Sequence, residues 1–277
     1  MTVRPTRKIR VIGAGLAGCE AAWQIARRGL RVVLQDMKPQ KMTPAHAYAG
    51  FAELVCSNSL KTNDIHKASG LLKEEMRRLS SLVMAAADSA RVAAGSALAV
   101  DRRAFSDAVT RAVRAHPNIE VVSEEAARIP EETAIIATGP LTGGALAQDI
   151  ARAAGGALSF FDAASPIVSA DSIDYGKAFF ASRYGRGEDY LNCPMDEETY
   201  ARFVEALTTA ECAPVRDFED ESVFEGCMPV EVMAARGRDT LRFGPLRPVG
   251  LTDPATGRRP FAVAQLRREN AQGTCYN

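Results

Sequence analysis

A glycine-rich hexapeptide placed directly after an apolar run constrains the fold of this chain more than any other feature. The run spans residues 9–12, and Gly13, Ala14, Gly15, Leu16, Ala17 and Gly18 follow it and open a helix-like segment that continues to residue 28. In such a strand-to-helix turn the first glycine permits the turn, the second lets the backbone approach a pyrophosphate, and the third lets the helix pack closely. The N–H groups at the helix N-terminus then face the anion. The pattern predicts a dinucleotide-binding α/β unit.

An acidic residue in the expected place supports this interpretation. A second apolar strand is expected at residues 31–35, and Asp36 follows it. An acid about 20 residues after the glycines can accept a hydrogen bond from a ribose hydroxyl. The alternative is a glycine-rich turn of another kind of α/β protein, but the order of strand, helix, strand and acid favours the dinucleotide.

Composition excludes several classes of protein. The 277 residues include 34 basic and 34 acidic side chains, so the chain has no net charge and any polyanion site must come from local arrangement. The polar residues 1–8 lead straight into a strand, which predicts neither a signal peptide nor a membrane span, and we expect a cytoplasmic protein. The six cysteines show no Cys-x-x-Cys spacing, which argues against a zinc site and a disulfide framework.

Further elements follow from the periodicity of apolar residues. Helices are expected at residues 71–87, 102–116 and 197–210, with Asp101 as the N-cap of the second, and buried strands at 119–122 and 134–137. Thr138 and Gly139 follow the last of these strands. Ligands of open α/β sheets bind at the carboxyl ends of the strands, so this small-residue turn is expected near the ligand.

The pattern of apolar residues, proline and glycine changes at about residue 160. Short apolar pieces then alternate with proline and glycine, which predicts an α+β region with its own sheet. We therefore expect an α/β domain over residues 1–165 and an α+β domain over residues 166–277.

Two cysteines stand in turn-like surroundings. Cys56 and Cys227 are each flanked by small or turn-forming residues, whereas Cys19 and Cys212 fit helices, and Cys193 and Cys275 are expected in loops. A lone cysteine is more often an inert buried residue than a reactive one. The surroundings of Cys56 and Cys227 favour accessible thiols at these two positions.

Arginines gather in the last part of the chain. After Cys227 there are eight arginines, no lysine and four acids, a net charge of +4; the arginines are residues 236, 238, 242, 247, 258, 259, 267 and 268. The simpler interpretation is a solvated face with surface ion pairs. The alternative is a phosphate-binding surface, because the planar guanidinium group suits phosphate oxygens.

Motifs along the whole chain resemble one family. They are GAGLAGCEAAWQIARRG, TPAH, FAELVCSNSLK, GLLKEEM, ALAVDR, IIATGPLT, FFDAASPIV, SRYG, YLNCPM, FEGCMPVE, FGPLRPVGL and AQLRRENAQGTCYN. Together they are similar to the folate- and flavin-dependent tRNA (uracil-5-)-methyltransferases. The resemblance implies a Rossmann-like FAD-binding domain of the glutathione-reductase type with an inserted α+β domain. Members of that family continue well past residue 277, so the resemblance implies a chain without the returning part of the FAD domain, and with weak activity or none by itself.

The resemblance also implies a reaction and roles for residues. A one-carbon unit passes from methylenetetrahydrofolate to C5 of a T-loop uridine of tRNA, reduced FAD supplies the electrons, and NAD(P)H is the reductant. Gly13 to Gly18 and Asp36 bind FAD, and Thr138 and Gly139 contact its adenosine half. Cys227 is the nucleophile toward uracil and Cys56 a second catalytic thiol, although the assignment between the two stays open. Arginines after Cys227 are then the candidate tRNA contacts.

Two other classes of function remain open at this point. A flavin- or NAD-dependent oxidoreductase acting on a small molecule explains the glycine turn, but neither the two cysteine motifs nor the arginines. A non-catalytic RNA-binding fragment explains the arginines, and it predicts salt-dependent RNA binding without flavin. Whether the RNA is tRNA or ribosomal RNA is also open.

Overall fold

The computed structural model describes residues 8–43, 45–139, 142–154, 165–211 and 228–277. The chain divides into two compact units. Unit 1 comprises residues 1–91 and 98–164, and unit 2 comprises residues 92–97 and 165–277. None of the described helices is long and apolar enough to cross a membrane.

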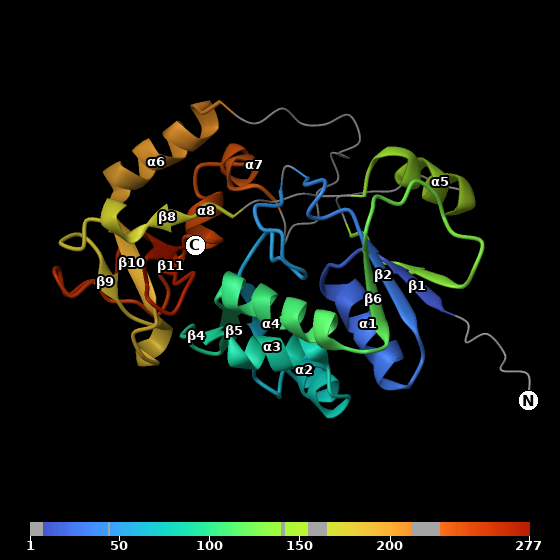
Figure 1. Cartoon of the computed structure of the whole chain (residues 1–277). Coiled ribbons are helices and arrows are strands. Elements are labelled where there is room, and N and C mark those ends of the chain that lie inside the picture. Colours follow the sequence, from blue (N-terminus) through green and yellow to red (C-terminus); the bar gives the residue numbers. More distant parts are fainter. Residues whose placement is uncertain (1–7, 44, 140–141, 155–164, 212–227) are drawn as a thin grey trace, which may run out of the picture. The chain divides into compact units, whose positions relative to one another are not determined.

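A parallel sheet of four strands forms the centre of unit 1. Its strands are β1 (Ile9–Ile12), β2 (Val32–Asp36), β6 (Ile119–Ser123) and β7 (Ala134–Ile136), in the order β6-β2-β1-β7. Helix α1 (Leu16–Arg27) connects β1 to β2 and lies along the sheet (Figure 1). Val11 and Leu34 pair in register and are both fully buried. The predicted Rossmann-like α/β fold is confirmed.

The expectation that residues 119–122 and 134–137 form buried strands is wrong in one respect. Both segments are strands, but β6 and β7 are the two edges of this sheet, so each has a neighbour on one side only. Ile135 in β7 is 39% exposed, whereas Val11 in the central β1 is fully buried. An apolar run does not distinguish an edge strand from a central one, because the order of strands is set by distant parts of the chain.

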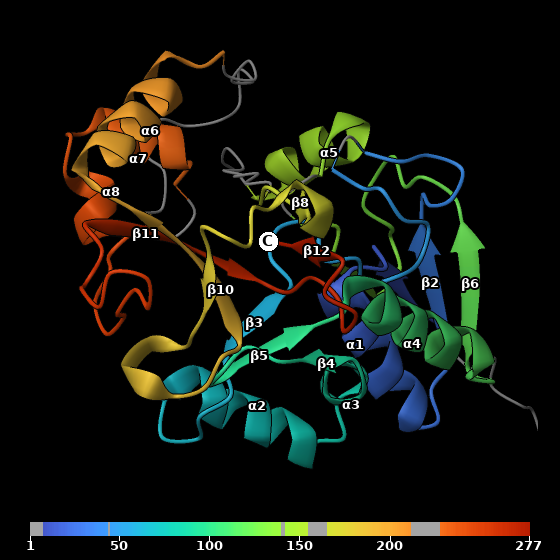
Figure 2. The same cartoon turned by 90° about the vertical axis from the view of Figure 1, so that its left-hand side faces the viewer.

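Helices and a small sheet complete unit 1 (Figure 2). The helices are α2 (Ala68–Arg78), α3 (Leu82–Ser89), α4 (Arg102–Ala115) and α5 (Gly144–Ala154), and the strands are β3 (Ser59–Thr62), β4 (Arg91–Val92) and β5 (Ala97–Val100), ordered β3-β5-β4. The predicted N-cap is confirmed: the side chain of Asp101 accepts a hydrogen bond from the N–H of Ala104.

The single helix expected over residues 71–87 is two helices. Ser80 adopts a φ of +55°, which ends the first helix, and Ser81 then caps α3 by accepting a hydrogen bond from the N–H of Met84 at 3.1 Å. Glu20 on α1 fixes this junction, because its carboxylate accepts hydrogen bonds from Ser81 Oγ at 2.7 Å and from the N–H of Val83 at 2.9 Å. The break lies within a continuous apolar periodicity, which is why that pattern alone missed it.

Unit 2 is α+β, as the change in the sequence pattern at about residue 160 predicts. Its strands are β8 (Val168–Ser169), β9 (Phe179–Phe180), β10 (Tyr190–Met195), β11 (Ala262–Arg267) and β12 (Cys275–Tyr276), and its helices are α6 (Glu197–Thr209), α7 (Val230–Ala235) and α8 (Thr240–Phe243). Strands β11, β10 and β9 form an antiparallel sheet, and β12 pairs with β8. The predicted helix over 197–210 is confirmed. Fully buried Tyr200 and Leu241 anchor the core of this unit.

Cys193 and Cys275 lie in strands rather than in loops. Cys193 is in β10 directly before Pro194, and a proline normally argues against a strand because it has no N–H to donate. Strand β9 pairs with β10 only at residues 191 and 192, so at Pro194 the strand has β11 as its one neighbour. The proline is tolerated there because one side of the strand is unpaired.

Candidate functional site

Three glycines of the turn between β1 and α1 have three different surroundings. Gly13 has a φ of +98°, and a Cβ atom there would lie 2.5 Å from the carbonyl oxygen of Ala137. At Gly18 a Cβ atom would lie 1.7 Å from the carbonyl oxygen of Gly13, so only glycine allows the helix to pack this closely. A Cβ atom at Gly15 would meet nothing within 4 Å, which leaves open space for a ligand. This is the arrangement that a bound pyrophosphate requires.

Asp36 lies beside this turn, as predicted. Its Oδ2 accepts a hydrogen bond from the N–H of Ala14 at 2.6 Å, although 22 residues separate the two along the chain. Its Oδ1 accepts another from the N–H of Lys38 at 2.9 Å. The carboxylate therefore stands at the carboxyl end of β2, next to the turn that faces the expected ligand.

Thr138 and Gly139 stand at the same edge of the sheet. The N–H of Ala137 donates to the carbonyl of Ile12 at 2.7 Å, and the Cα atom of Thr138 lies within 2.9 Å of the position of a Cβ at Gly13. Gly139 has a φ of +73° and open space around it. The carboxyl ends of β1, β2 and β7 thus bring together the glycine turn, Asp36 and the Thr138 turn.

The segment that carries Cys56 is attached directly to the glycine turn. The N–H of Ala52 donates to the carbonyl of Ala14 at 2.8 Å, and Ala52 is fully buried with a φ of +50°. Phe51 is also held on both sides, because its carbonyl accepts from Ser106 Oγ at 2.5 Å and its N–H donates to Thr110 Oγ1 at 2.8 Å. Helix α4 therefore holds this segment against the turn.

Cys56 itself is exposed and bears a free thiol. Arg102 at the start of α4 donates from Nη2 to the carbonyl of Cys56 at 2.7 Å and from Nη1 to the carbonyl of Leu54. The guanidinium group fixes the backbone on which the thiol stands. An accessible thiol is open to reaction, whereas a cysteine buried in apolar surroundings is inert.

A buried lysine supports the other end of the same segment. The side chain of Lys38 is 4% exposed, and its Nζ donates to the carbonyl of Gly50 at 2.6 Å. It also lies 3.8 Å from Oε2 of Glu53, whose Oε1 accepts from the N–H of Ala47 at 2.8 Å. A buried ammonium group needs such partners to offset its loss of hydration. Lys38 thus connects the end of β2 to the segment that leads to Cys56.

The other described cysteines lie in less reactive surroundings. Burial raises the pKa of the Cys19 thiol to about 12, and the charge on Asp36 adds to the rise. The thiol lies 3.3 Å from the carbonyl of Ala14, to which it donates. Burial raises the pKa of Cys193 as well. Cys212 and Cys227 lie outside the described residues. The candidate site therefore includes Cys56 and leaves out Cys227, the expected nucleophile.

Sequence reasoning missed three residues that build the site. They are Lys38, Ala52 and Arg102. A lysine that follows a strand and an arginine that opens a helix are usually exposed, and nothing in the local sequence marks these two as buried or backbone-bound. Only the predicted N-cap at Asp101, adjacent to Arg102, pointed to this region of α4.

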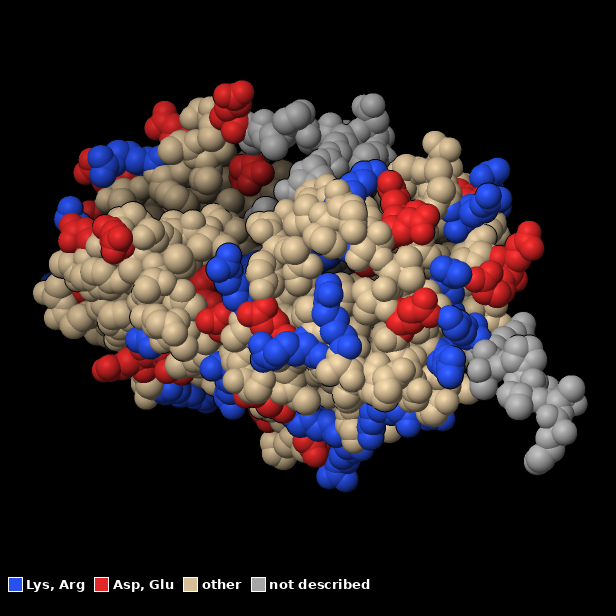
Figure 3. Space-filling model, in the orientation of Figure 1, with Lys and Arg blue, Asp and Glu red and all other residues tan. Residues whose placement is uncertain are grey.

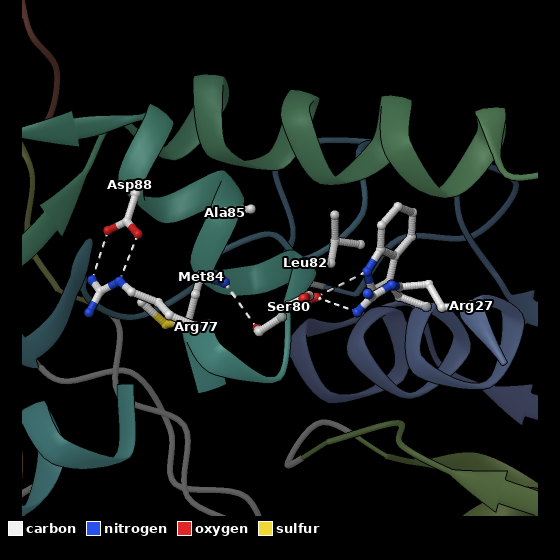
Figure 4. A pocket seen from close by; sticks show the side chains of 9 residues that line it. Arg27, Arg77, Ser80, Leu82, Met84, Ala85 and Asp88 are labelled. Atoms are coloured by element: carbon white, nitrogen blue, oxygen red, sulfur yellow. Dashed lines mark hydrogen bonds and ion pairs between the residues drawn. The ribbon is translucent and has the colours of Figure 1, made fainter. Parts of the chain in front are cut away.

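A hollow of about 530 Å³ lies among the helices of unit 1, and its polar side chains bind one another and the backbone (Figure 4). Trp23 Nε1 and Arg27 Nη1 both donate to the carbonyl of Ser80, at 3.3 and 3.2 Å. Arg77 forms a two-bonded ion pair with Asp88 at 2.8 Å. These polar groups close the junction between α2 and α3 and are already engaged with one another.

Neither one sign of charge on the face in Figure 3 nor a metal-binding cluster among the described residues marks a second catalytic centre. Basic and acidic side chains alternate over the face shown in Figure 3. Within the described ranges, no group of three or more histidine, cysteine or acidic side chains is placed to hold a metal ion. The glycine turn with Asp36 and the Cys56 segment is therefore the candidate site.

Comparison with known proteins shows the family of the chain. Residues 8–277 match the family model described as "Glucose inhibited division protein A". A protein of Geobacter sulfurreducens named methylenetetrahydrofolate--tRNA-(uracil-5-)-methyltransferase TrmFO is 61% identical over 275 residues, which is 98% of this chain and 63% of that protein. Proteins of the same name from Acetivibrio thermocellus and Rubrobacter xylanophilus are 61% identical over 272 residues and 60% identical over 270 residues.

The overlap covers nearly all of this chain but only part of those relatives. The match to the Acetivibrio protein covers 97% of this chain and 62% of that protein, and the match to the Rubrobacter protein covers 97% and 60%. The chain thus spans about three fifths of the length of the curated relatives it matches. Since the family model covers all but the first residues, the chain belongs to the glucose inhibited division protein A family.

Proposed function

We propose that this chain carries the FAD-binding turn and the two catalytic thiols of a folate-dependent tRNA (uracil-5-)-methyltransferase. The observation that carries the proposal is the hydrogen bond from the N–H of Ala52 to the carbonyl of Ala14. It joins the segment of an exposed cysteine to the glycine turn that binds the dinucleotide in our proposal, a combination that ordinary hydride transfer does not require. Relatives about 60% identical carry the name of this activity.

The residues at the sheet edge fit the proposed cofactor. Helix α1 begins at Leu16, and a helix N-terminus presents backbone N–H groups that suit a pyrophosphate, which the open space at Gly15 admits. Asp36 accepts hydrogen bonds from a ribose, and Thr138 and Gly139 border the adenosine half. When bound, the flavin supplies the electrons that turn a transferred methylene group into a methyl group.

The thiols perform the chemistry on the RNA base. C5 of uracil is a weak nucleophile, so a thiolate first adds to C6, and the electrons of the C5–C6 double bond form an enolate. C5 then bonds to the methylene carbon as one methylene–nitrogen bond of the folate breaks. C5 loses its proton to a base as the second methylene–nitrogen bond breaks and tetrahydrofolate leaves. Hydride addition to the resulting methylene, for which the bound flavin would supply the electrons, returns the C5–C6 double bond as the bond from sulfur to C6 breaks. Cys227 carries the addition in our proposal, and Cys56 is the second thiol.

The co-substrates complete the proposal. NAD(P)H is the upstream reductant, methylenetetrahydrofolate is the carbon donor, and the target is a uridine in the T-loop of tRNA. Because the reaction needs reduced thiols, reduced folate and tRNA together, we propose the cytoplasm as its location.

Isotope transfer tests the proposal. The chain is incubated with FAD, NADPH, unmodified tRNA and methylenetetrahydrofolate labelled in its methylene carbon, and the RNA nucleosides are analysed by mass spectrometry. We expect label in 5-methyluridine at a low rate, in keeping with the weak activity that the resemblance implies for this chain by itself. Cys56→Ser should lose about 100-fold of that rate, because catalysis through a thiolate has no equivalent at a serine. Cys193→Ala, which changes a half-buried thiol in unit 2, is the matched control and should retain the wild-type rate.

The two other classes of function predict different results. NADPH oxidation that is rapid without RNA and unaffected at Cys56 would favour a small-molecule oxidoreductase. RNA binding without flavin binding and without label in the RNA would favour a non-catalytic fragment. Label in ribosomal RNA but not in tRNA would change the substrate and keep the chemistry.

A further inference from the structure

A hollow in unit 2 combines arginines with exposed aromatic surface. Its volume is about 680 Å³, and residues from α8, from the turn after it and from the segment before β11 line it. Arg242, Arg247 and Arg259 supply three positive charges to its lining, and no acidic residue lines it. Within the described part of the chain, the one ion pair that these arginines form is from Arg242 to Asp239, at 4.0 Å.

Phe243 forms the aromatic part of this hollow. It is 72% exposed, more than any other large apolar side chain among the described residues. The guanidinium carbon of Arg242 lies 5.2 Å from the centre of the Phe243 ring and 3.8 Å from that of Phe261. The arginine thus stacks against Phe261 and stands beside Phe243, and its Nε donates to the carbonyl of Phe261 at 3.2 Å. The Phe243 ring is therefore exposed beside a guanidinium group that Phe261 holds in place.

The rest of unit 2 holds this surface in place. Leu241, next to Arg242, is fully buried, and the N–H of Arg242 donates to the hydroxyl of buried Tyr200 at 3.1 Å. The N–H of Val263 in β11 donates to the carbonyl of Leu246 at 2.9 Å, which fixes the turn after α8. A surface that is already ordered binds a partner without the entropy cost of ordering it.

The rim of the hollow concentrates positive charge. Arg183 Nη1 donates to the carbonyls of Arg247 and Val249, at 2.7 and 2.8 Å. Burial lowers the pKa of Arg183, and the charge of Arg247 lowers it further. Two cations that repel each other, without an acid between them, are stabilised by an anion bound at this rim.

We propose that this hollow binds an unpaired nucleotide of RNA, with the base stacked on Phe243 and the flanking phosphates on Arg247 and Arg259. The inference rests on the proposed function and extends it by assigning an RNA contact outside the candidate catalytic site. Stacking on an exposed ring together with arginines for the backbone is the way in which proteins bind single strands. An acidic peptide would use the arginines but would leave the ring without a specific role.

Direct binding measurements test this proposal without flavin, folate or catalysis. The probes are a fluorescent 12-nucleotide single-stranded RNA and a blunt RNA duplex of the same length, and the readout is anisotropy at several salt concentrations. Phe243→Leu removes the ring and keeps apolar bulk. Arg247→Gln with Arg259→Gln removes two phosphate contacts. The matched controls are Tyr175→Leu, an exposed ring elsewhere in unit 2, and Arg202→Gln, an exposed arginine of α6 outside the lining.

The two changes should act differently. We expect Phe243→Leu to weaken binding of the single strand by about tenfold while the slope of log affinity against log salt stays unchanged, because stacking is not ionic. The double arginine variant should weaken binding of both probes and reduce that slope for the single strand by about 1.4, roughly 0.7 for each lost phosphate contact. Both controls should bind as the wild type does, and thermal unfolding monitors the fold of every variant.

Several outcomes would overturn the assignment. Wild-type affinity in both hollow variants would remove it, and so would an equal loss in the Tyr175 and Arg202 controls. Competition by a glutamate-rich peptide as strong as by RNA, with no effect of Phe243→Leu, would instead assign a protein partner. No methyl transfer by the wild-type chain, together with single-strand binding that Phe243→Leu and the double arginine variant weaken, would contradict the proposed function and leave this surface standing.

Discussion

At the scale of single residues, the buried thiol of Cys19 links stability to pH. Its pKa is about 12 in the folded chain against an ordinary value of 9.0. Between these values the unfolded chain releases the proton and the folded chain keeps it, so stability that is complete below pH 9 is lost as the pH rises toward 12. From pH 8 to pH 10, the free energy of unfolding should fall by about 1.4 kcal/mol more in the wild type than in Cys19→Ala. Urea unfolding at both pH values measures this difference. An equal loss in variant and wild type would contradict the prediction.

Two glycines of the turn provide a second test at this scale, because they differ in the space around them. Gly15→Ala adds a methyl group to open space, so we expect a folded chain whose FAD affinity falls about tenfold or more, since the methyl group occupies the approach of the pyrophosphate. Gly18→Ala forces the helix away from Gly13, so we expect a lower melting temperature as well. Calorimetric FAD titration and thermal unfolding of both variants separate the effects. A Gly15→Ala chain that binds FAD normally would show that the ligand lies elsewhere.

At the scale of elements, the segment from Lys38 to Cys56 depends on a buried ion pair. Lys38→Met removes the donor to Gly50 and leaves Glu53 buried without its counter-charge, which we expect to cost about 3 kcal/mol of unfolding free energy. Adding Glu53→Gln should recover part of this loss, because the unpaired charge is then gone. Urea unfolding gives the free energies, and the alkylation rate of Cys56 shows whether the segment has moved. Additive losses in the double variant would show that the two side chains do not interact.

Elements that depend on local sequence were predictable, and those that depend on distant partners were not. The helix α4 and its cap Asp101 were predictable, because a cap and one apolar face lie within 14 residues. The edge positions of β6 and β7 were not, because strand order reflects the whole sheet. The break at Ser80 and Ser81 was missed because the carboxylate of Glu20, far away in sequence, holds it.

At the scale of the whole molecule, residues 92–97 belong to unit 2, although their neighbours along the chain belong to unit 1. The N–H of Gly95 donates to Asp189 Oδ2 at 2.6 Å, and the hydroxyl of Tyr190 donates to the carbonyl of Ala94 at 2.8 Å. Asp189→Ala should therefore speed hydrogen exchange at the amide of Gly95 by about tenfold, because the acceptor is lost. Asp174→Ala, which removes the acceptor in a separate turn, is the control and should leave Gly95 unchanged. Equal exchange in wild type and Asp189→Ala would contradict this contact.

The candidate site shows the same division between local and distant information. The glycine turn and Asp36 were predictable, because the strand, turn, helix and strand that place them are consecutive. The attachment of the Cys56 segment was not, because it depends on a left-handed backbone at Ala52 and on Arg102, a residue of another element. No composition or spacing rule marks an alanine for such a conformation, since most alanines in folded chains never adopt it.

The peptide unit of Ala14 is held at both ends, its N–H by the carboxylate of Asp36 and its carbonyl by the N–H of Ala52 and the thiol of Cys19. A protein engineer who transplanted the glycine turn to another sheet as a cofactor cassette would lose these partners, which lie in three separate segments. The smallest transferable module is consequently the whole stretch from β1 to Cys56 together with the start of α4.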